Sequence, residues 1–244
     1  MEFKAKHAVV TGGANGIGRC IAEAFIREGA AVTVIDIDKR IFEGVRMNHG
    51  DIADKNTLKN FVDGLDAPVD FLINNACVSR RGLLSGCSYE DFEYVQRVGV
   101  TAPYYLTNLL FNKNFFAANA SVVNIASTRA LQSQADTESY SAVKGGIVAL
   151  THAMAVSLAG RVRVNCISPG WIDTTVTTDH SKSDKRQHPS GRVGTPGDIT
   201  EMVLFLCSGK AGFINGENIT IDGGMSKLMV YHGDCGWEFT GDEA

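Results

Sequence analysis

The sequence predicts an α/β protein built on a doubly wound parallel sheet in a single domain. Short runs rich in β-branched residues alternate along the chain with stretches of helical periodicity. This alternation is typical of right-handed βαβ units whose sheet is covered by helices on both faces. The predicted strands are residues 7–11, 32–36, 69–74, 121–127, 161–168 and 218–222, and the predicted helices are residues 16–28, 54–65, 89–111, 139–158 and 198–207.

One connection is shorter than the pattern requires. Few residues separate Asp36 from Asp51, although a βαβ unit would ordinarily hold a helix and a further strand there. We expect a strand around residues 45–49, with a very short helix or none before it. No internal repeat, low-complexity tract or linker divides the chain, so we expect one domain over residues 1–224, with residues 225–244 as its C-terminal extension.

The composition excludes several classes of protein. The 244 residues are 44% hydrophobic and 20% charged, with a net charge of -4, as in an ordinary globular domain. No lysine and arginine cluster predicts binding to nucleic acid or to an anionic membrane, and no apolar stretch suits a membrane span or a signal peptide. The six cysteines have neither Cys-x-x-Cys nor metal-ligand spacing, so we expect buried thiols, no metal and a cytoplasmic protein.

A glycine-rich segment, TGGANGIG, lies between the first predicted strand and the first predicted helix. Glycines serve turns as often as ligands, so the segment alone leaves both functions open. Gly12 ends the strand, and Gly16 and Gly18 open the helix, where absent Cβ atoms would let a diphosphate approach free backbone N–H groups. Asn15 and Ile17 stand between these glycines and are expected to contact the same ligand.

An acidic residue at the end of the second predicted strand completes this unit. Asp36 ends the sequence VTVID, where a carboxylate can accept hydrogen bonds from the adenosine ribose hydroxyls and repel a 2′-phosphate. The strand, glycine turn, helix and acid together predict a dinucleotide site that prefers NAD to NADP. Lys39 and Arg40 follow closely, so we do not expect the preference to be absolute.

Five short motifs occur in order: T-G-x-x-x-G-x-G from Thr11, NNA from Asn74, Ser127, YSAVK from Tyr140, and SPG from Ser168. With these motifs the chain closely resembles the short-chain dehydrogenase/reductase family, over about residues 6–224. The resemblance implies a Rossmann-type sheet, a nicotinamide cofactor, and hydride transfer between an alcohol and a ketone. It makes residues 1–224 a dinucleotide-binding and catalytic domain.

The resemblance also implies which further residues surround the cofactor. One group lies on the adenine and adenosine side, and the other group follows or belongs to the SPG motif, where two residues hold the nicotinamide carboxamide. The first group is Asp51, Ile52, Asn74 and Ala76, and the second is Pro169 and Gly170 with the carboxamide-binding Ile172 and Thr174.

Three polar residues suggest the chemistry. Tyr140 and Lys144 are four positions apart in a predicted helix, so they share one face and the ammonium can lie near the phenol. A nearby cation and an oxidised nicotinamide favour the phenolate, which makes Tyr140 the candidate general acid and base. Ser127 ends a predicted strand, where its hydroxyl can hold the substrate oxygen. Tyr140 and Lys144 also contact the cofactor, Lys144 through the ribose hydroxyls on the nicotinamide side.

Two positions depart from the family pattern. Gly99 stands where an asparagine is usual in the central helix, and Cys77 replaces the glycine that commonly follows NNA. That asparagine resembles a fourth catalytic residue, whose backbone carbonyl supports a water between the lysine and solvent. Glycine keeps the carbonyl but weakens a helix by about 1 kcal/mol relative to alanine. We therefore expect proton exchange with solvent to be slower or rerouted.

The set of Ser127, Tyr140 and Lys144 predicts an NAD-dependent oxidoreductase that acts on a secondary alcohol or its ketone. The alternative, motivated by Gly99 and Cys77, is a non-catalytic dinucleotide-binding module that senses redox state. An epimerase or dehydratase is disfavoured because such relatives usually need a larger C-terminal substrate region.

The substrate and the assembly are less constrained. Residues 175–191 predict a mobile polar lid whose charges either attract an anionic substrate or belong to a solvated loop, and Trp171 either walls the pocket or packs beneath that lid. Apolar residues are left over on the two long predicted helices after one face meets the sheet, and they predict a homodimer or homotetramer. They are Val100, Tyr104, Leu109, Val148 and Met154.

The C-terminal extension is rich in large apolar residues between Leu228 and Phe239, including Trp237. Such residues are too numerous for a segment that is simply solvated. Two arrangements remain open: residues 225–231 pack on their own subunit, or residues 231–239 cross to a neighbouring subunit and help to close its active site.

Overall fold

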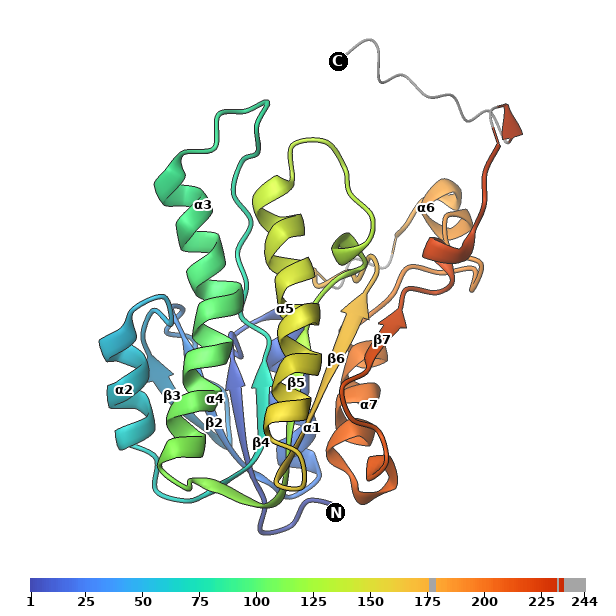
Figure 1. Cartoon of the computed structure of the whole chain (residues 1–244). Helices are drawn as coiled ribbons and strands as arrows, with labels where there is room; N and C mark the ends of the chain where they lie inside the picture. Colours follow the sequence, from blue (N-terminus) through green and yellow to red (C-terminus); the bar gives the residue numbers. More distant parts are fainter. Residues whose placement is uncertain (176–178, 232, 235–244) are drawn as a thin grey trace.

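The computed structural model describes residues 1–175, 179–231 and 233–234. Seven parallel strands form one sheet in the order β3-β2-β1-β4-β5-β6-β7, with helices on both faces (Figure 1). The predicted doubly wound fold is therefore confirmed. The strands are β1 (His7–Thr11), β2 (Ala31–Asp36), β3 (Val45–His49), β4 (Val69–Asn74), β5 (Phe116–Ile125), β6 (Val162–Pro169) and β7 (Asn218–Ile221).

Helices cover the two faces of the sheet in separate sets. On one face α1 and α7 pack on the sheet through Phe25 and Val203, and on the other α2, α4 and α5 do so through Phe61, Leu106 and Met154. Met154, one of the apolar residues from which a contact between subunits was predicted, is thus buried within its own chain. The helices are α1 (Gly16–Arg27), α2 (Lys55–Asp63), α3 (Tyr89–Gln96), α4 (Ala102–Asn112), α5 (Glu138–Ser157), α6 (Lys182–Arg186) and α7 (Pro196–Cys207).

The burial of each strand agrees with the polarity of its sequence. All six residues of β4 are buried, as expected for a parallel strand covered on both faces. The edge strand β3 is only partly buried, and its sequence Val-Arg-Met-Asn-His mixes apolar and polar residues accordingly. The strand predicted over residues 45–49 is confirmed, and residues 37–44 before it contain no helix.

Two elements differ most from their predicted limits. The helix predicted over residues 89–111 is α3 and α4 joined by a π-helical turn at Arg97–Thr101, which contains Gly99. Strand β5 begins at Phe116 and ends at Ile125, whereas the prediction began at Ser121 and ended at Ser127. Its first residues, Phe-Ala-Ala-Asn-Ala, contain no β-branched side chain, so the local pattern gave no sign of a strand there.

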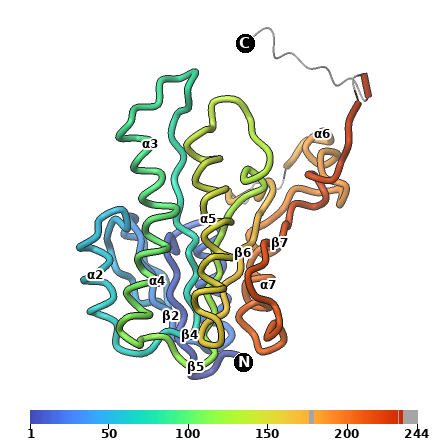
Figure 2. The backbone as a smooth tube through the Cα atoms, viewed as in Figure 1, coloured from blue at the N-terminus to red at the C-terminus, as the bar shows by residue number. Residues whose placement is uncertain are grey.

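The chain after β7 lies against residues 188–190, which follow α6 (Figure 2), and the backbone N–H of Ser190 donates to the carbonyl of Gly223. Leu228, Met229, Val230 and Tyr231 are 40% to 74% exposed, so these residues do not pack on the core of their own subunit. Trp237 and Phe239 lie outside the described residues. In the described part of the chain, no helix has both the length and the apolar character needed to cross a membrane.

Candidate active site

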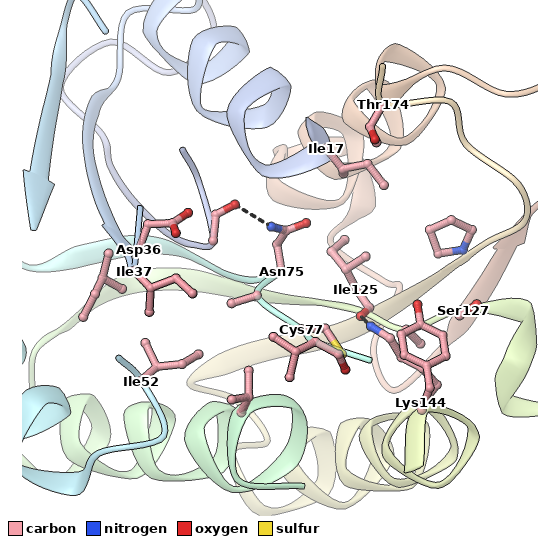
Figure 3. A pocket seen from close by; sticks show the side chains of 18 of the residues that line it. Ile17, Asp36, Ile37, Ile52, Asn75, Cys77, Ile125, Ser127, Lys144 and Thr174 are labelled. Atoms are coloured by element: carbon pink, nitrogen blue, oxygen red, sulfur yellow. Dashed lines mark hydrogen bonds between the residues drawn. The ribbon is translucent and has the colours of Figure 1, made fainter. Parts of the chain in front are cut away.

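A cleft of about 430 Å³ lies at the carboxyl edge of the sheet (Figure 3). The chain winds in opposite directions from β1 and β4, which are neighbours, and such a switch point leaves a crevice between the connections. Residues at or just after the ends of four strands line the cleft: Asp36 at the end of β2, Asn75 after β4, Ser127 after β5 and Gly170 after β6. The fold therefore brings most of the predicted site residues to one edge.

The glycine turn is shaped by close backbone contacts. Gly12 has a φ of +65°, and a Cβ atom there would lie 2.8 Å from the Cα atom of Ala76. At Gly18 a Cβ atom would lie 2.2 Å from the carbonyl oxygen of Gly12. Gly18 thus lets α1 pack against the turn, and it does not line the cleft as the sequence suggested, whereas Gly12 does. These glycines make the turn and also bring backbone close to the cleft.

The N-terminus of α1 differs from those of α2 and α3. Asp54 and Ser88 cap α2 and α3 through their side chains, but Asn15, at the same position before α1, makes no capping hydrogen bond. Its side-chain amide instead donates to Asp38, at 3.1 Å. The first backbone N–H groups of α1 therefore have no side-chain cap, which fits the diphosphate of a dinucleotide, and Ile17 in this turn lines the cleft (Figure 3).

Two carboxylates lie close together after β2. The Asp36 carboxylate lines the cleft and accepts hydrogen bonds from the backbone N–H groups of Ala14 and Asp38, both at 2.9 Å. Its remaining lone pairs fit ribose hydroxyls. Asp38 pairs with Arg40 at 2.6 Å, and hydrogen bonds from this arginine hold the pKa of the Asp38 carboxyl well below its ordinary value. The arginine charge next to the cleft is thus already neutralised.

The same end of the cleft has an apolar floor. Ile37 and Ile52 lie near each other there (Figure 3), and Asp51 and Ile52 both line the cleft as predicted. The Tyr94 hydroxyl donates to the Asp51 carboxylate at 3.0 Å, and burial together with this bond raises the pKa of Tyr94. Apolar walls beside one fixed carboxylate suit the flat face and polar edge of an adenine.

The NNA motif places a different asparagine in the cleft from the one expected. Asn74 is 4% exposed, and its side-chain amide donates to Asn124 on β5 at 2.8 Å. Asn75 lines the cleft instead, and it donates to the carbonyl oxygen of Gly12 at 2.9 Å (Figure 3). The family resemblance implied Asn74, but Asn74 is the last residue of β4, and the side chain that reaches the cleft belongs to Asn75, the first residue beyond the strand. Ala76 does line the cleft.

Ser127, Tyr140 and Lys144 all line the cleft. Lys144 is 4% exposed, its ammonium donates to the Ile125 carbonyl at 2.8 Å, and it lies 5.3 Å from the centre of the Tyr140 ring. Ser127 is not on β5 but two residues beyond it, where its hydroxyl oxygen accepts the Arg129 backbone N–H at 3.2 Å. This leaves the Ser127 proton free to be donated to a ligand oxygen.

A second hollow, of about 910 Å³, continues from the cleft between the loop after β5 and the loop after β6. Ser127, Tyr140, Gly170 and Ile172 line both spaces, so the reactive side chains stand where the two meet. Trp171 lines the second hollow and is 40% exposed, which agrees with a wall of the pocket. Pro169 and Thr174 line only the cleft.

Most described residues of the segment over residues 175–191 are exposed, which agrees with a solvated segment, but the segment also contains a short helix and one buried side chain. Its helix α6 begins with a capping box between Ser181 and Asp184. His188 is 2% exposed, and His180 lies 3.1 Å from the carboxylate of Asp173. The ring centre of Trp171 lies 5.7 Å from that of His180 and 6.0 Å from that of His188.

Gly99 lies close both to Cys77 and to Val143 on α5, the helix that carries Tyr140 and Lys144. A Cβ atom on Gly99 would lie 2.5 Å from Val143 and 3.5 Å from the Cys77 sulfur, and Cys77 itself lines the cleft. The prediction of uniformly buried thiols is therefore wrong: Cys20, Cys77 and Cys87 are only partly buried. Among the described cysteines, Cys166 and Cys207 are buried, and burial raises the pKa of their thiols to about 11 and about 12.

The fold and the cleft define a dinucleotide-binding α/β enzyme. A family model described as enoyl-(acyl carrier protein) reductase matches residues 12–226. An uncharacterized oxidoreductase of Thermotoga maritima is 41% identical, covering 94% of this chain and 99% of that protein. The chain therefore belongs to the short-chain dehydrogenase/reductase family of oxidoreductases.

Solved structures agree with this assignment. An apo SCOR enzyme from Clostridium thermocellum is 46% identical with a TM-score of 0.88, covering 97% of this chain and 99% of that one. A 3-ketoacyl-(acyl-carrier-protein) reductase from Brucella melitensis, complexed with NADH, is 29% identical with a TM-score of 0.79, covering 92% of this chain and 99% of that one. This chain is thus an oxidoreductase with a dinucleotide cofactor.

Proposed function

We propose that this protein transfers a hydride between NAD(H) and a secondary alcohol or its ketone. The observation that carries the proposal is the meeting of Ser127, Tyr140 and Lys144 at the carboxyl edge of the sheet, with two of them at the junction between the cleft and the second hollow. A module that only binds a dinucleotide has no need of a hydroxyl, a phenol and a buried ammonium at this junction.

Each of the three side chains has a distinct task. The nicotinamide cofactor supplies the hydride acceptor for alcohol oxidation and the hydride donor for the reverse reaction. Ser127 donates a hydrogen bond to the substrate oxygen, because its own oxygen already accepts the Arg129 N–H. Tyr140 takes the hydroxyl proton of the alcohol, or returns it to the ketone oxygen. The Lys144 ammonium, 5.3 Å from the phenol ring centre, favours the phenolate that accepts this proton.

The proposed cofactor is NAD. Asp36 provides acceptors for two ribose hydroxyls and repels a phosphate at the 2′ position, while Asp38 neutralises Arg40, a basic group close enough to oppose that repulsion. The complex of the Brucella melitensis relative with NADH is consistent with this preference. The predicted contacts of Asn15, Gly16, Pro169 and Thr174 with this cofactor remain part of the proposal.

The test compares Tyr140→Phe with the parent in NADH formation from a panel of secondary alcohols. General acid–base groups typically contribute about 10²- to 10⁴-fold to the rate, so we expect kcat to fall by that range while NAD binding persists. Tyr89→Phe is the matched control, because Tyr89 is 77% exposed at the start of α3. Equal turnover by Tyr140→Phe would exclude this base. Cofactor binding without turnover of any alcohol or ketone would favour the non-catalytic module.

The proposed assembly is a homodimer or homotetramer. Tyr104 on α4 is 51% exposed and Val156 on α5 is 77% exposed, so these helices present apolar side chains to solvent in the single chain. In the family that the chain resembles, the same two helices pair across a two-fold axis, and burial of such side chains favours association. Light scattering at micromolar concentration should give a multiple of the chain mass, and a monomeric mass would contradict the proposal.

A further inference from the structure

The second hollow is lined mainly by polar side chains. Hydroxyl and amide groups predominate among its described lining residues, and Trp171, Ile172 and Met225 are its larger apolar ones. A substrate with a long hydrocarbon chain would leave many of these polar groups without partners, and burying them unpaired costs free energy. The polar ones besides Tyr140 and Arg129 are Ser79, Ser127, Thr128, Gln132, Ser133, Gln134, Thr137 and Gln187.

Among the described residues that line this hollow, Arg129 has the one charged side chain. It is half-buried, and none of the ion pairs formed by described residues includes it. Its guanidinium instead donates to the neutral side-chain oxygen of Gln134. The nearest acidic residues in sequence are otherwise engaged, because Asp136 and Glu138 accept hydrogen bonds from the backbone of residues 83–85.

The position of Arg129 links this charge to the reacting oxygen. Arg129 lies on the 3-10 turn Thr128–Ala130, two residues after Ser127, and its backbone N–H is bonded to the Ser127 hydroxyl. Arg129 lines the second hollow but not the cleft predicted to hold the cofactor, and its guanidinium is bonded to Gln134, which lines the same hollow. The charge is therefore directed to the substrate side, where cofactor phosphates do not neutralise it.

We propose that Arg129 binds a carboxylate of the substrate, which makes the substrate class small hydroxy acids and the corresponding keto acids. Guanidinium groups bind carboxylates through paired, charge-assisted hydrogen bonds, and Gln134 can remain as a neighbour that orients the guanidinium. In the oxidation the carbinol carbon loses a hydride to the nicotinamide cofactor, and its hydroxyl proton passes to Tyr140, which gives the keto acid. This inference rests on the oxidoreductase function proposed above.

The experiment uses pairs of substrates that are similar in size and shape, one with a carboxylate and the other with the neutral amide. We would compare 2-hydroxybutyrate, 3-hydroxybutyrate and gluconate with the primary amide of each, in the full-length protein with NAD. The parent should prefer at least one acid to its amide. In Arg129→Gln the KM for that acid should rise about 10- to 100-fold, as expected for loss of a charge-assisted hydrogen bond, while its kcat and the NAD affinity change little. The KM for the amide should not change.

Two further variants separate charge from packing. Arg129→Lys keeps the charge and should recover part of the loss in KM, whereas Arg27→Gln, at the exposed end of α1, should behave as the parent. Binding is also measured without turnover, as the rise in Tm that each acid or amide produces in the presence of NADH. An Arg129-dependent rise in Tm with the acid and not with the amide supports the inference even where no compound is turned over.

The outcomes distinguish this inference from the proposed function. If uncharged alcohols or an acetoacetyl thioester react at rates that Arg129→Gln leaves unchanged, and no acid is preferred to its amide, the carboxylate site is wrong while the oxidoreductase function stands. If the acid raises Tm in an Arg129-dependent way and nothing is oxidised or reduced, the carboxylate site stands and the catalytic function fails. Equal Tm shifts for acids and amides in the parent would overturn the carboxylate site.

Discussion

The two ends of the active-site cleft are built by different means. The end proposed to hold the cofactor is lined by a glycine after β1 and by carboxylates at or shortly after the ends of strands, all positioned by the sheet. At the substrate end the lining groups are side chains on loops, and polar contacts between side chain and backbone hold these loops. The first end is defined by topology, which relatives share, and the second by individual residues of this chain.

Charge differs in the same sense between the two ends. Asp36 and Asp51 line the cofactor end, whereas Arg129 provides the charge among the described residues of the substrate hollow. A carboxylate substrate that entered at the cofactor end would be repelled, and a ribose diol has no use for the arginine. Under the two proposals above, this distribution of charge would favour the cofactor at one end of the cleft and a carboxylate substrate at the other.

The largest expected effect is on cofactor choice, and it tests the cofactor end alone. Asp36→Asn removes the charge that repels a 2′-phosphate and weakens acceptance from the ribose hydroxyls. We expect NAD to bind about 10- to 100-fold more weakly and NADP to bind more tightly, so the preference should shrink by about 100-fold or more. Direct titration of both cofactors measures this ratio, and the KM for the alcohol should change little.

Asp63→Asn is the control for this change. Asp63 lies on α2, where it pairs with Lys113 on the surface, so the variant has the same change in net charge outside the cleft. If it altered the ratio as much as Asp36→Asn does, the preference would come from the overall field of the protein. Equal affinity of the parent for NAD and NADP would remove the premise.

The next effect concerns Gly99, which lies against Val143 on α5. A Cβ atom there would come within 2.5 Å of Val143, the residue before Lys144. Gly99→Ala should therefore lower the free energy of unfolding by about 1–3 kcal/mol, as overpacking usually does. Denaturant unfolding measures the loss, and kcat should fall as well because the strain displaces the turn of α5 that carries Lys144.

A double-mutant cycle with Val143→Ala sharpens this prediction. Removing the two methyl groups of Val143 leaves a cavity in the parent but relieves the clash in Gly99→Ala. The two changes together should thus cost less than the sum of their separate losses in unfolding free energy. Strict additivity would show that the backbone around Gly99 shifts away from Val143 instead.

The sequence predicted the features that are set by strand ends and helical spacing better than those that depend on individual loop residues. Gly12, Asp36 and the Tyr140–Lys144 pair line the cleft as expected from strand ends and helical spacing, and Asp51 lines it as the family resemblance implied. Other features depend on where an element stops or on contacts between distant segments, which local patterns do not contain. They are the choice of Asn75 over Asn74, the position of Ser127 beyond β5, the bond from Tyr94 to Asp51, and Arg129.

Arg129 and Gly99 show why some signals were missed or misread. Arg129 stands in a polar run, TRALQSQADTES, and its only sequence signal was an arginine close to Ser127. Gly99 was interpreted as a weakness of a helix, but the structure shows a π-helical turn packed closely against α5. The roles of both residues depend on their neighbours in space, which the sequence around each residue does not show.

The smallest expected effect tests how the substrate end is held. Asp198, in the first turn of α7, accepts hydrogen bonds from the Thr195 backbone N–H at 2.7 Å and from the Arg192 guanidinium at 2.5 and 2.7 Å. Next to these residues, Gly194 pairs with Ile172, which lines both spaces. Asp198→Asn weakens this cap and should lower the free energy of unfolding at pH 7 by about 1 kcal/mol.

The pH dependence of this loss identifies its cause. Hydrogen bonds from Arg192 and Thr195 hold the pKa of Asp198 well below its ordinary value, against the opposing effect of burial. A carboxyl with a lowered pKa in the folded state stabilises the protein above its unfolded pKa of about 3.9, and this contribution is lost as the pH falls through the folded value. The difference between parent and Asp198→Asn should therefore be constant near neutrality and shrink below about pH 4. If the loop after β6 depends on this cap, the variant also raises the KM for the alcohol more than the Kd for NAD, whereas equal changes in both would show that α7 supports the two ends alike.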